Sequence, residues 1–293
     1  MKKKVAEYGF LASMLAVPIV AFICFWCATN LNSILLAFQK RENGIVTFTL
    51  SNFELMFQDI MSAGSVFNES LGNTLIFFCV SVFVMVPLTL VFSFLLNAKI
   101  PLYRAYRFIF YLPTIVPVTV MTIVFKYLIG PDGPIDEVYR ILGDHLPAFL
   151  SDSRYAMKTL VFYSIWTGFG VNLILFMSAM NRVPQECLEA ARIDGIGFWG
   201  EFFKIILPLI WPTITTVLTL ALTNLFNSSG PILLLTEGRG KTNTISYWIF
   251  DMVYQQFNYE YSAAVGVFFT LIGLPIILLG RKILTKLGSV NEY

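Results

Sequence analysis

EAARIDGIGFWGEFFKIILP, residues 189–208, is a polar stretch between two long apolar blocks of the chain. Pro184 suits the first position of a helix and Gly195 suits the residue just past a helix end, so residues 184–194 are predicted to form a short helix. A second short helix is predicted over residues 198–206. Two short helices joined at a glycine make a bent polar projection in an otherwise apolar chain.

The second short helix carries an aromatic face. Phe198, Trp199, Phe202 and Phe203 surround Glu201. An apolar patch rimmed by charge needs a cover. Two interpretations follow from these residues: the helix lies on a membrane interface, or the projection inserts into a partner protein.

The composition identifies an integral membrane protein. Of 293 residues, 57% are hydrophobic and 13% are charged, whereas soluble domains carry about 25% charged residues. The formal net charge of +2 is too small to indicate binding to nucleic acid. The lipid bilayer is therefore the expected environment of the chain.

Six stretches are apolar and long enough to span a bilayer as helices, which need about 20 residues each. The predicted fold class is all-α, with six transmembrane helices and the short helix of residues 184–194 between the fourth and the fifth. The predicted spans are residues 10–29, 72–96, 108–129, 160–180, 207–226 and 263–284.

The distribution of lysine and arginine predicts the orientation. Short cytoplasmic loops are enriched in these residues. One side of the membrane receives both termini and two short, basic loops, while the opposite loops are longer and poorer in basic residues; the first group includes Lys2, Lys3, Lys4, Arg104, Arg107, Arg182, Arg281 and Lys282. Both termini are therefore expected in the cytoplasm.

This topology gives three predicted parts. Residues 1–71 hold a cytoplasmic tail, the first span and an extracytoplasmic loop. Residues 72–285 form a core of five spans, with the polar loop at residues 184–206, and residues 286–293 form a second cytoplasmic tail. In the outer loops, Asn52 is expected to cap a short helix over residues 53–57, and an amphipathic helix is expected over residues 135–142.

No metal, cofactor or nucleotide site is predicted. The four cysteines are spread over three distant parts of the chain, and the single histidine, His145, has no cysteine near it in sequence. Gly240-Lys241-Thr242 resembles the end of a phosphate-binding loop, but position 235, where that loop requires glycine, is Leu235. If ATP drives this protein, another chain hydrolyses it.

Neutral polar residues interrupt three of the spans, where polar groups are unfavourable unless protein or water surrounds them. They could line a cavity for a neutral, hydroxyl-rich solute, which needs donors and acceptors rather than charge. They could equally hold helices together. The candidates are Thr114 in the third span, Ser164, Thr167, Gly168 and Asn172 around Trp166 in the fourth, and Asn224, Asn227 and Ser228 at the end of the fifth.

The polar stretch itself resembles a known family. Glu189-Ala190-Ala191, Asp194-Gly195 and Ile205-Ile206-Leu207-Pro208 are similar to the EAA loop of permease subunits of binding-protein-dependent ABC importers, including the spacing from the glycine to the Ile-x-Leu-Pro. The surroundings resemble the carbohydrate branch, to which the maltose permease belongs. Supporting stretches are residues 73–75, 107–113, 184–189 and 234–236.

The resemblance implies one subunit of a larger machine in a bacterial inner membrane. Two permeases, the second a different chain, would form the pathway, and an external binding protein would deliver a sugar. Two cytosolic ABC ATPases would each receive one EAA loop in a groove and hydrolyse the ATP, so this chain would not be an enzyme.

The resemblance also implies roles for residues. In the ATPase-coupling loop it points to Glu189, Ala190, Ala191, Asp194, Gly195 and Phe198. It places Thr114, Thr167, Gly168, Asn224, Asn227 and Ser228 at or beside sugar-contacting positions.

The sequence departs from the family pattern at two places, and two alternative functions stay open. Glu237-Gly238-Arg239-Gly240 stands where the carbohydrate branch commonly has Gly-Gly-Pro after the threonine, and position 196 is Ile196 where many relatives have alanine. Within the same importer class, the solute could be a polyol or a sugar phosphate. An intramembrane enzyme is disfavoured because the spans hold no paired carboxylates and no histidine.

Overall fold

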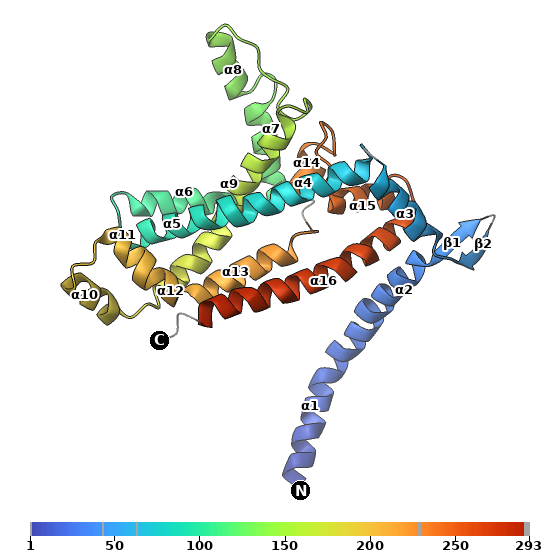
Figure 1. Ribbon diagram of the computed structural model, residues 1–293, viewed down its shortest axis with the longest axis horizontal. Helices are drawn as coiled ribbons and strands as arrows, with labels where there is room; N and C mark the ends of the chain where they lie inside the picture. The colour runs from blue at the N-terminus through green and yellow to red at the C-terminus, as the bar shows by residue number, and fades with distance from the viewer. Residues whose placement is uncertain (1, 43, 63, 228–229, 290–293) are drawn as a thin grey trace. The chain divides into compact units, whose positions relative to one another are not determined.

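The computed structural model describes residues 2–42, 44–62, 64–227 and 230–289 (Figure 1). The chain forms two compact units, the first comprising Met1–Ala63 and Ile249–Leu271, the second Gly64–Trp248 and Ile272–Tyr293. The elements are α1 (Lys2–Ala21), a π-helical segment (Phe22–Cys27), α2 (Ala28–Ala37), β1 (Gln39–Glu42), β2 (Ile45–Phe48), α3 (Ser51–Met61), α4 (Val66–Val80), a π-helical segment (Ser81–Met85), α5 (Val86–Asn97), α6 (Tyr103–Ile115), α7 (Val118–Ile129), α8 (Pro134–Ile141), α9 (Ala156–Met180), α10 (Gln185–Ile193), α11 (Phe198–Glu201), a π-helical segment (Phe202–Ile206), α12 (Leu207–Leu209), α13 (Trp211–Thr223), α14 (Gly230–Leu235), α15 (Ile245–Tyr254) and α16 (Tyr259–Ser289).

The N-terminal span of the first unit is longer than predicted. The apolar helix runs over Phe10–Ala37 and so passes residue 29, where the sequence predicted its end. Its large side chains are exposed, with Phe25 at 79% and Val17 at 75%. Side chains of this kind require an apolar environment, which lipid or another protein provides.

Asn52 does not cap a helix over residues 53–57, so that prediction was wrong. The helix is α3, which already begins at Ser51, and Asn52 lies buried inside its first turn. The side-chain amide of Asn52 donates instead to the carbonyl oxygens of Ala37 (3.1 Å) and Gln39 (2.8 Å). It thereby ties α3 to the end of α2 and to the β1–β2 hairpin.

A hydrophobic core in the second unit gathers residues from several helices. α5 and α9 cross and pack against each other, and the segment from residue 202 to α13 completes the cluster (Figure 1). The most buried members are Val86, Phe94, Phe176, Met180, Phe202, Ile206, Ile210 and Val217.

Four helices are long and apolar enough to cross a membrane, or six if each of two bent helix pairs counts as one span. The third predicted span is divided between α6 and α7, and Tyr103–Ile115 and Val118–Ile141 are bent by 107°. Pro117 explains the break, because a residue before proline is driven out of the helical region, and Val116 is extended with ψ at 136°. The fifth predicted span bends by 71° at Ile210, two residues before Pro212.

The second span contains a change of helical phase. α4 and α5 are joined without a break by the π-helical segment Ser81–Met85, and together they form the span Val66–Asn97. A π-helical turn accommodates an extra residue in an α-helix. The face presented by α4 is therefore rotated relative to the face presented by α5.

The middle of α4 holds the loop that precedes α15. The amide of Asn73 donates to the carbonyl oxygens of Lys241 (2.9 Å) and Asn243 (2.8 Å), and the backbone N–H of Ile245 donates to the hydroxyl of Thr74 (3.0 Å). These bonds join residues about 170 positions apart and are buried or half-buried.

The same loop contains the departure from the Gly-Gly-Pro pattern. Glu237, Gly238, Gly240 and Lys241 all have positive φ. A Cβ on Gly238 would lie 2.2 Å from the Asn243 side-chain oxygen, so only glycine fits there. In the loop after α7, α8 forms over Pro134–Ile141, which confirms the predicted amphipathic helix to within one residue.

Candidate functional site

The first candidate site is the polar projection, residues 184–206. α10 spans Gln185–Ile193, after Pro184 and before Asp194, as the sequence predicted to within one residue. Gly195 has a φ of +76°, and the N–H groups of Gly195 and Ile196 donate to the carbonyl oxygens of Arg192 (3.1 Å) and Ala191 (3.0 Å). This pair of bonds is a Schellman motif, which ends the helix and satisfies its last carbonyl groups.

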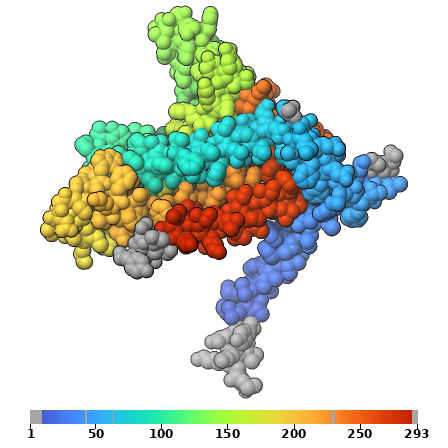
Figure 2. Space-filling view, in the orientation of Figure 1, coloured from blue at the N-terminus to red at the C-terminus, as the bar shows by residue number. Residues whose placement is uncertain are grey.

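α10 presents a small polar surface and lies at an exposed corner of the second unit (Figure 2). Of the predicted coupling residues, Glu189, Ala190, Asp194 and Gly195 are exposed, and Ala191 is buried. Ile193 is 85% exposed beside them. The projection therefore offers exposed acids, Glu189 and Asp194 among them, and the large apolar side chain of Ile193 to a partner.

The aromatic face of the second short helix is anchored to the core. Phe198 is about half exposed, and its ring lies 4.6 Å from that of Phe94 on α5. The ring of Phe202 also lies 4.8 Å from that of Phe94. Trp199 and Phe203 remain at least half exposed. Neither interpretation of this aromatic face predicted that its inner part packs against the core of the chain itself, and both stay open for the exposed Trp199 and Phe203.

Sequence reasoning missed an ion pair within the projection. Nε and Nη2 of Arg192 donate to the two carboxylate oxygens of Glu201 at 3.0 and 3.2 Å. This contact raises the pKa of the Arg192 guanidinium. The signal in the sequence is an acid, Glu201, on the apolar face of a helix, where a charge requires a partner.

The second candidate site is a cavity of about 640 Å³ in the second unit, here called the polar cavity. It lies at the break between α6 and α7 and is closed by α4, the π-helical segment Ser81–Met85, α9 and the turn after α13. Six of the nine predicted pathway residues line it: Thr114, Ser164, Thr167, Gly168, Asn224 and Asn227.

The lining of the polar cavity is neutral, with no Asp, Glu, Lys or Arg among its described residues. The hydroxyl oxygens of Thr114 and Ser164 are buried and have no hydrogen-bond partner in the part of the chain that the structure describes. Thr167 donates to the carbonyl oxygen of Tyr163 (2.9 Å), which leaves its lone pairs available as acceptors.

Other lining residues were not predicted. Ser81 comes from the π-helical segment, and Val116 and Pro117 come from the helix break, neither of which the apolar pattern signals. Gly170 fits closely behind the cavity, because a Cβ there would lie 2.2 Å from the Thr114 hydroxyl and 3.0 Å from the carbonyl oxygen of Phe110. It lets α6 approach α9 closely.

The structure does not bring three predicted residues into the polar cavity. Asn172 lies one turn beyond Gly168 and is not among the lining residues. Ser228 lies outside the described residues. Trp166 lines a different cavity, because successive residues of an α-helix differ by about 100° in direction and Trp166 points away from Ser164 and Thr167.

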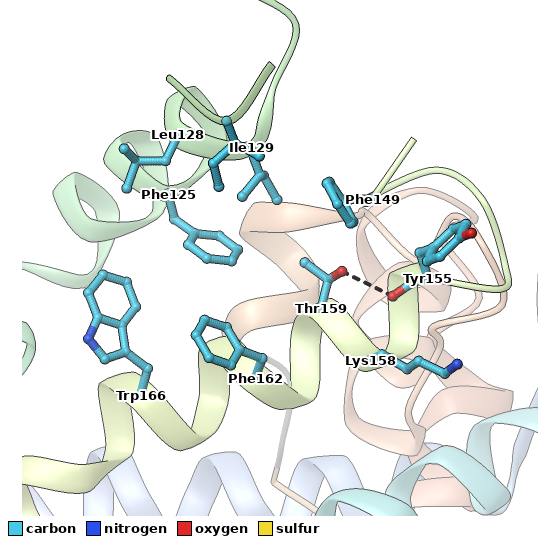
Figure 3. A pocket seen from close by; sticks show the side chains of 10 residues that line it. Phe125, Leu128, Ile129, Phe149, Tyr155, Lys158, Thr159, Phe162 and Trp166 are labelled. Carbon is cyan, nitrogen blue, oxygen red and sulfur yellow. Dashed lines mark hydrogen bonds between the residues drawn. The ribbon is translucent and has the colours of Figure 1, made fainter. Parts of the chain in front are cut away.

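That second cavity, here called the apolar cavity, has a volume of about 480 Å³ (Figure 3). Trp166 and Phe162 extend into it from α9, opposite Phe125, Leu128 and Ile129 of α7. Its polar lining residues are Tyr155, Lys158 and Thr159, and the hydroxyl of Thr159 already donates to the backbone carbonyl oxygen of Tyr155 (3.0 Å). The apolar cavity therefore offers a bound molecule little beyond van der Waals contact.

Comparison with known proteins identifies the class. Residues 96–287 match the family "Binding-protein-dependent transport system inner membrane component". AraP, the arabinooligosaccharides transport system permease protein of Bacillus subtilis (strain 168), is 25% identical over 289 residues, which are 96% of this chain and 89% of AraP. UgpA, the sn-glycerol-3-phosphate transport system permease protein of Yersinia pseudotuberculosis serotype I (strain IP32953), is 33% identical over 131 residues, 43% of this chain and 45% of UgpA.

A solved structure shares the fold. The crystal structure of a bacterial ABC transporter involved in the import of the acidic polysaccharide alginate contains a chain that superposes with a TM-score of 0.85, at 22% identity, over 97% of this chain and 98% of that one.

The chain belongs to the family of binding-protein-dependent transport system inner membrane components. It is a membrane-spanning permease of an ABC import system, as the EAA loop indicated, and the all-α fold class is confirmed with it. Its relatives are permease components, not enzymes.

Proposed function

We propose that this permease moves a sugar or oligosaccharide across the membrane. The observation that carries the proposal is the neutral lining of the polar cavity, to which Thr167, Asn224 and Asn227 contribute hydroxyl and amide groups. Such groups both donate and accept hydrogen bonds, so the lining suits a ligand rich in hydroxyls. The naming of AraP for arabinooligosaccharides supports a sugar.

The proposed machine contains four kinds of partner. A second, different permease completes the pathway, two cytosolic ABC ATPases drive it, an extracytoplasmic binding protein delivers the solute, and the bacterial inner membrane surrounds the spans. Both termini lie in the cytoplasm. The lysine and arginine distribution supports this orientation, because short cytoplasmic loops are enriched in these residues. The orientation puts α10 on the same side of the membrane as ATP.

In the proposed mechanism, one ATPase receives α10 of this chain, and the other receives the corresponding loop of the second permease. The exposed carboxylate of Glu189 accepts a charge-assisted hydrogen bond from a basic group in the ATPase groove. When ATP closes the ATPase pair, α10 moves and carries the 198–206 segment with it. That segment continues into α12 and α13, and the end of α13 leads to Asn224 and Asn227 at the polar cavity.

A sugar phosphate is the second candidate, since UgpA is named for sn-glycerol-3-phosphate. Phosphate groups in proteins are usually held by arginine or lysine. Among its described lining residues, the polar cavity has neither. Neutral sugars and polyols are therefore favoured, and competition of phosphorylated against neutral solutes for uptake distinguishes the two.

Two substitutions in α10 test the coupling role. A β-branched residue at the left-handed position of Gly195 is unfavourable by about 1–2 kcal/mol and misdirects the next helix. Glu189→Lys places a cation where a basic partner is expected. We expect Gly195→Val and Glu189→Lys to insert normally, yet to lose the stimulation of ATP hydrolysis by loaded binding protein in the reconstituted complex.

Glu186→Gln is the matched control, because Glu186 is also exposed on α10 but lies a turn earlier, away from the Gly195 bend. If ATP hydrolysis by both test variants is stimulated by loaded binding protein as strongly as in the wild type, α10 is not the coupling element.

A further inference from the structure

The ion pair between Arg192 and Glu201 closes a loop around the Gly195 bend. Arg192 lies in the last turn of α10, and Glu201 is the last residue of α11. The two contacts, Nε to Oε2 at 3.0 Å and Nη2 to Oε1 at 3.2 Å, form a two-point fork. A planar guanidinium bound at two points fixes direction as well as distance.

The two partners differ in burial. The side chain of Glu201 is 10% exposed, and that of Arg192 is 58% exposed. Glu201 is adjacent to Phe202, which belongs to the hydrophobic core of the second unit. A buried carboxylate is unfavourable unless it is paired, so Arg192 is the group that makes this position of Glu201 tolerable.

The same arginine has a second acid within reach. Glu189 precedes Arg192 by three residues on α10, a spacing at which opposite charges on a helix meet. Its charge also favours the protonated form of Arg192, although less than Glu201 does, and both raise the pKa of that guanidinium. Within the described chain, however, Arg192 forms its salt bridge with Glu201, and Glu189 forms none.

We propose that Arg192 and Glu201 form an internal strut, which sets the angle of α10 against α11 and keeps Glu189 available to the ATPase. The inference rests on the proposed coupling role of α10. Arg192 and Glu201 are positioning residues, because they act through α10 and Glu189 and do not themselves contact the ATPase. Without the strut, α10 still docks, but its motion no longer passes to residues 198–206 as a rigid body.

The test is a double-mutant cycle in the reconstituted complex: Arg192→Gln, Glu201→Gln, and both together. Two quantities are measured, the ATPase that copurifies with the permease and the solute transported per ATP hydrolysed. We expect each single variant to lower transport per ATP by about tenfold, the scale of a lost charge-assisted contact, while copurified ATPase stays within about twofold. The double variant should be no worse than Arg192→Gln, since it removes the buried unpaired carboxylate.

Two further variants sharpen the result. Arg182→Gln is the matched control, because Arg182 is an exposed arginine before α10 whose side chain, among the described residues, donates to the carbonyl oxygen of Ser178 (3.3 Å) and forms no salt bridge. This variant should transport normally. Arg192→Lys keeps the charge but not the fork, so it should fall between wild type and Arg192→Gln. If Arg192→Gln fails to assemble, the strut still requires the double variant to assemble better than this single one.

Independent, multiplicative effects of the two substitutions would overturn the strut, as would an Arg192→Gln variant indistinguishable from Arg182→Gln. Glu189→Lys separates this failure from failure of the proposed function. If Glu189→Lys abolishes coupling while the Arg192 and Glu201 variants do not, only the strut is wrong. If Glu189→Lys also has no effect, the coupling role of α10 is wrong and the strut is withdrawn with it.

Discussion

The polar cavity and the apolar cavity lie on the same two helices and differ in what they can bind. Their volumes, about 640 and 480 Å³, are similar. α9 lines the first with Ser164, Thr167 and Gly168 and the second with Phe162 and Trp166. The comparison shows that cavity size does not identify a solute pathway here. The neutral hydroxyl and amide side chains of the polar cavity favour it as the proposed pathway, because a hydrophilic solute needs hydrogen-bond donors and acceptors.

The largest effect that would test this comparison comes from adding the same side chain to each cavity. Gly168→Leu points an isobutyl group into the polar cavity, where a Cβ already lies 3.1 Å from the Met85 sulfur. Overpacking of this kind is unfavourable by about 1–3 kcal/mol, so solute uptake should fall roughly 10- to 100-fold.

Thr159→Leu is the matched control, because it adds bulk to the apolar cavity from the same helix. Its uptake by reconstituted complex should stay within about twofold of wild type. Equal losses in both variants would contradict the assignment of the pathway to the polar cavity.

A smaller effect is expected from removing hydroxyls without changing shape. Thr114→Val and Ser164→Ala each delete a buried oxygen that has no internal partner among the described residues. A net hydrogen bond contributes about 1 kcal/mol, so each variant should weaken solute uptake roughly fivefold.

Thermal stability of the same variants provides the control. Because no internal hydrogen bond is lost, the melting temperature should stay the same or rise. A fall in melting temperature that parallels the fall in uptake would support the interpretation of these hydroxyls as contacts between helices.

The smallest effect is expected at Trp166. Trp166→Phe trims the apolar cavity only, so uptake should remain within about twofold of wild type. Asn227→Leu provides the contrast, since it places an apolar group in the lining of the polar cavity and should reduce uptake clearly. A strong loss from Trp166→Phe would extend the pathway into the apolar cavity.

Much of this fold follows from the sequence, because lipid demands long apolar helices and contact with water demands polar breaks between them. The ends of α10 were predictable because Pro184 and Gly195 act locally. The break at Val116 was not predicted, although Pro117 is visible in the sequence. Proline is tolerated within membrane helices, and hydropathy does not depend on whether a helix is bent.

For the polar cavity, the sequence predicted which types of residue line it better than it predicted the directions in which their side chains point. Thr114 and Asn227 meet in space because of the 107° break and the turn after α13, which no periodicity reveals. Trp166 was grouped with its neighbours in sequence, but one helical step turned it toward the other cavity. The Arg192–Glu201 pair joins two helices across a bend, so its nine-residue spacing matches no helical repeat.

The π-helical segment Ser81–Met85 amounts to one inserted residue in the middle of a span. Above it, Asn73 and Thr74 face the loop at residues 241–245; below it, Phe94 faces the core. Without the insertion, the two halves would differ in direction by about 100° from their present arrangement. The number of residues in this span is therefore as constrained as their type. If one residue between 81 and 85 were deleted, Asn73 and Thr74 could not hold the loop at residues 241–245 while Phe94 still packs in the core.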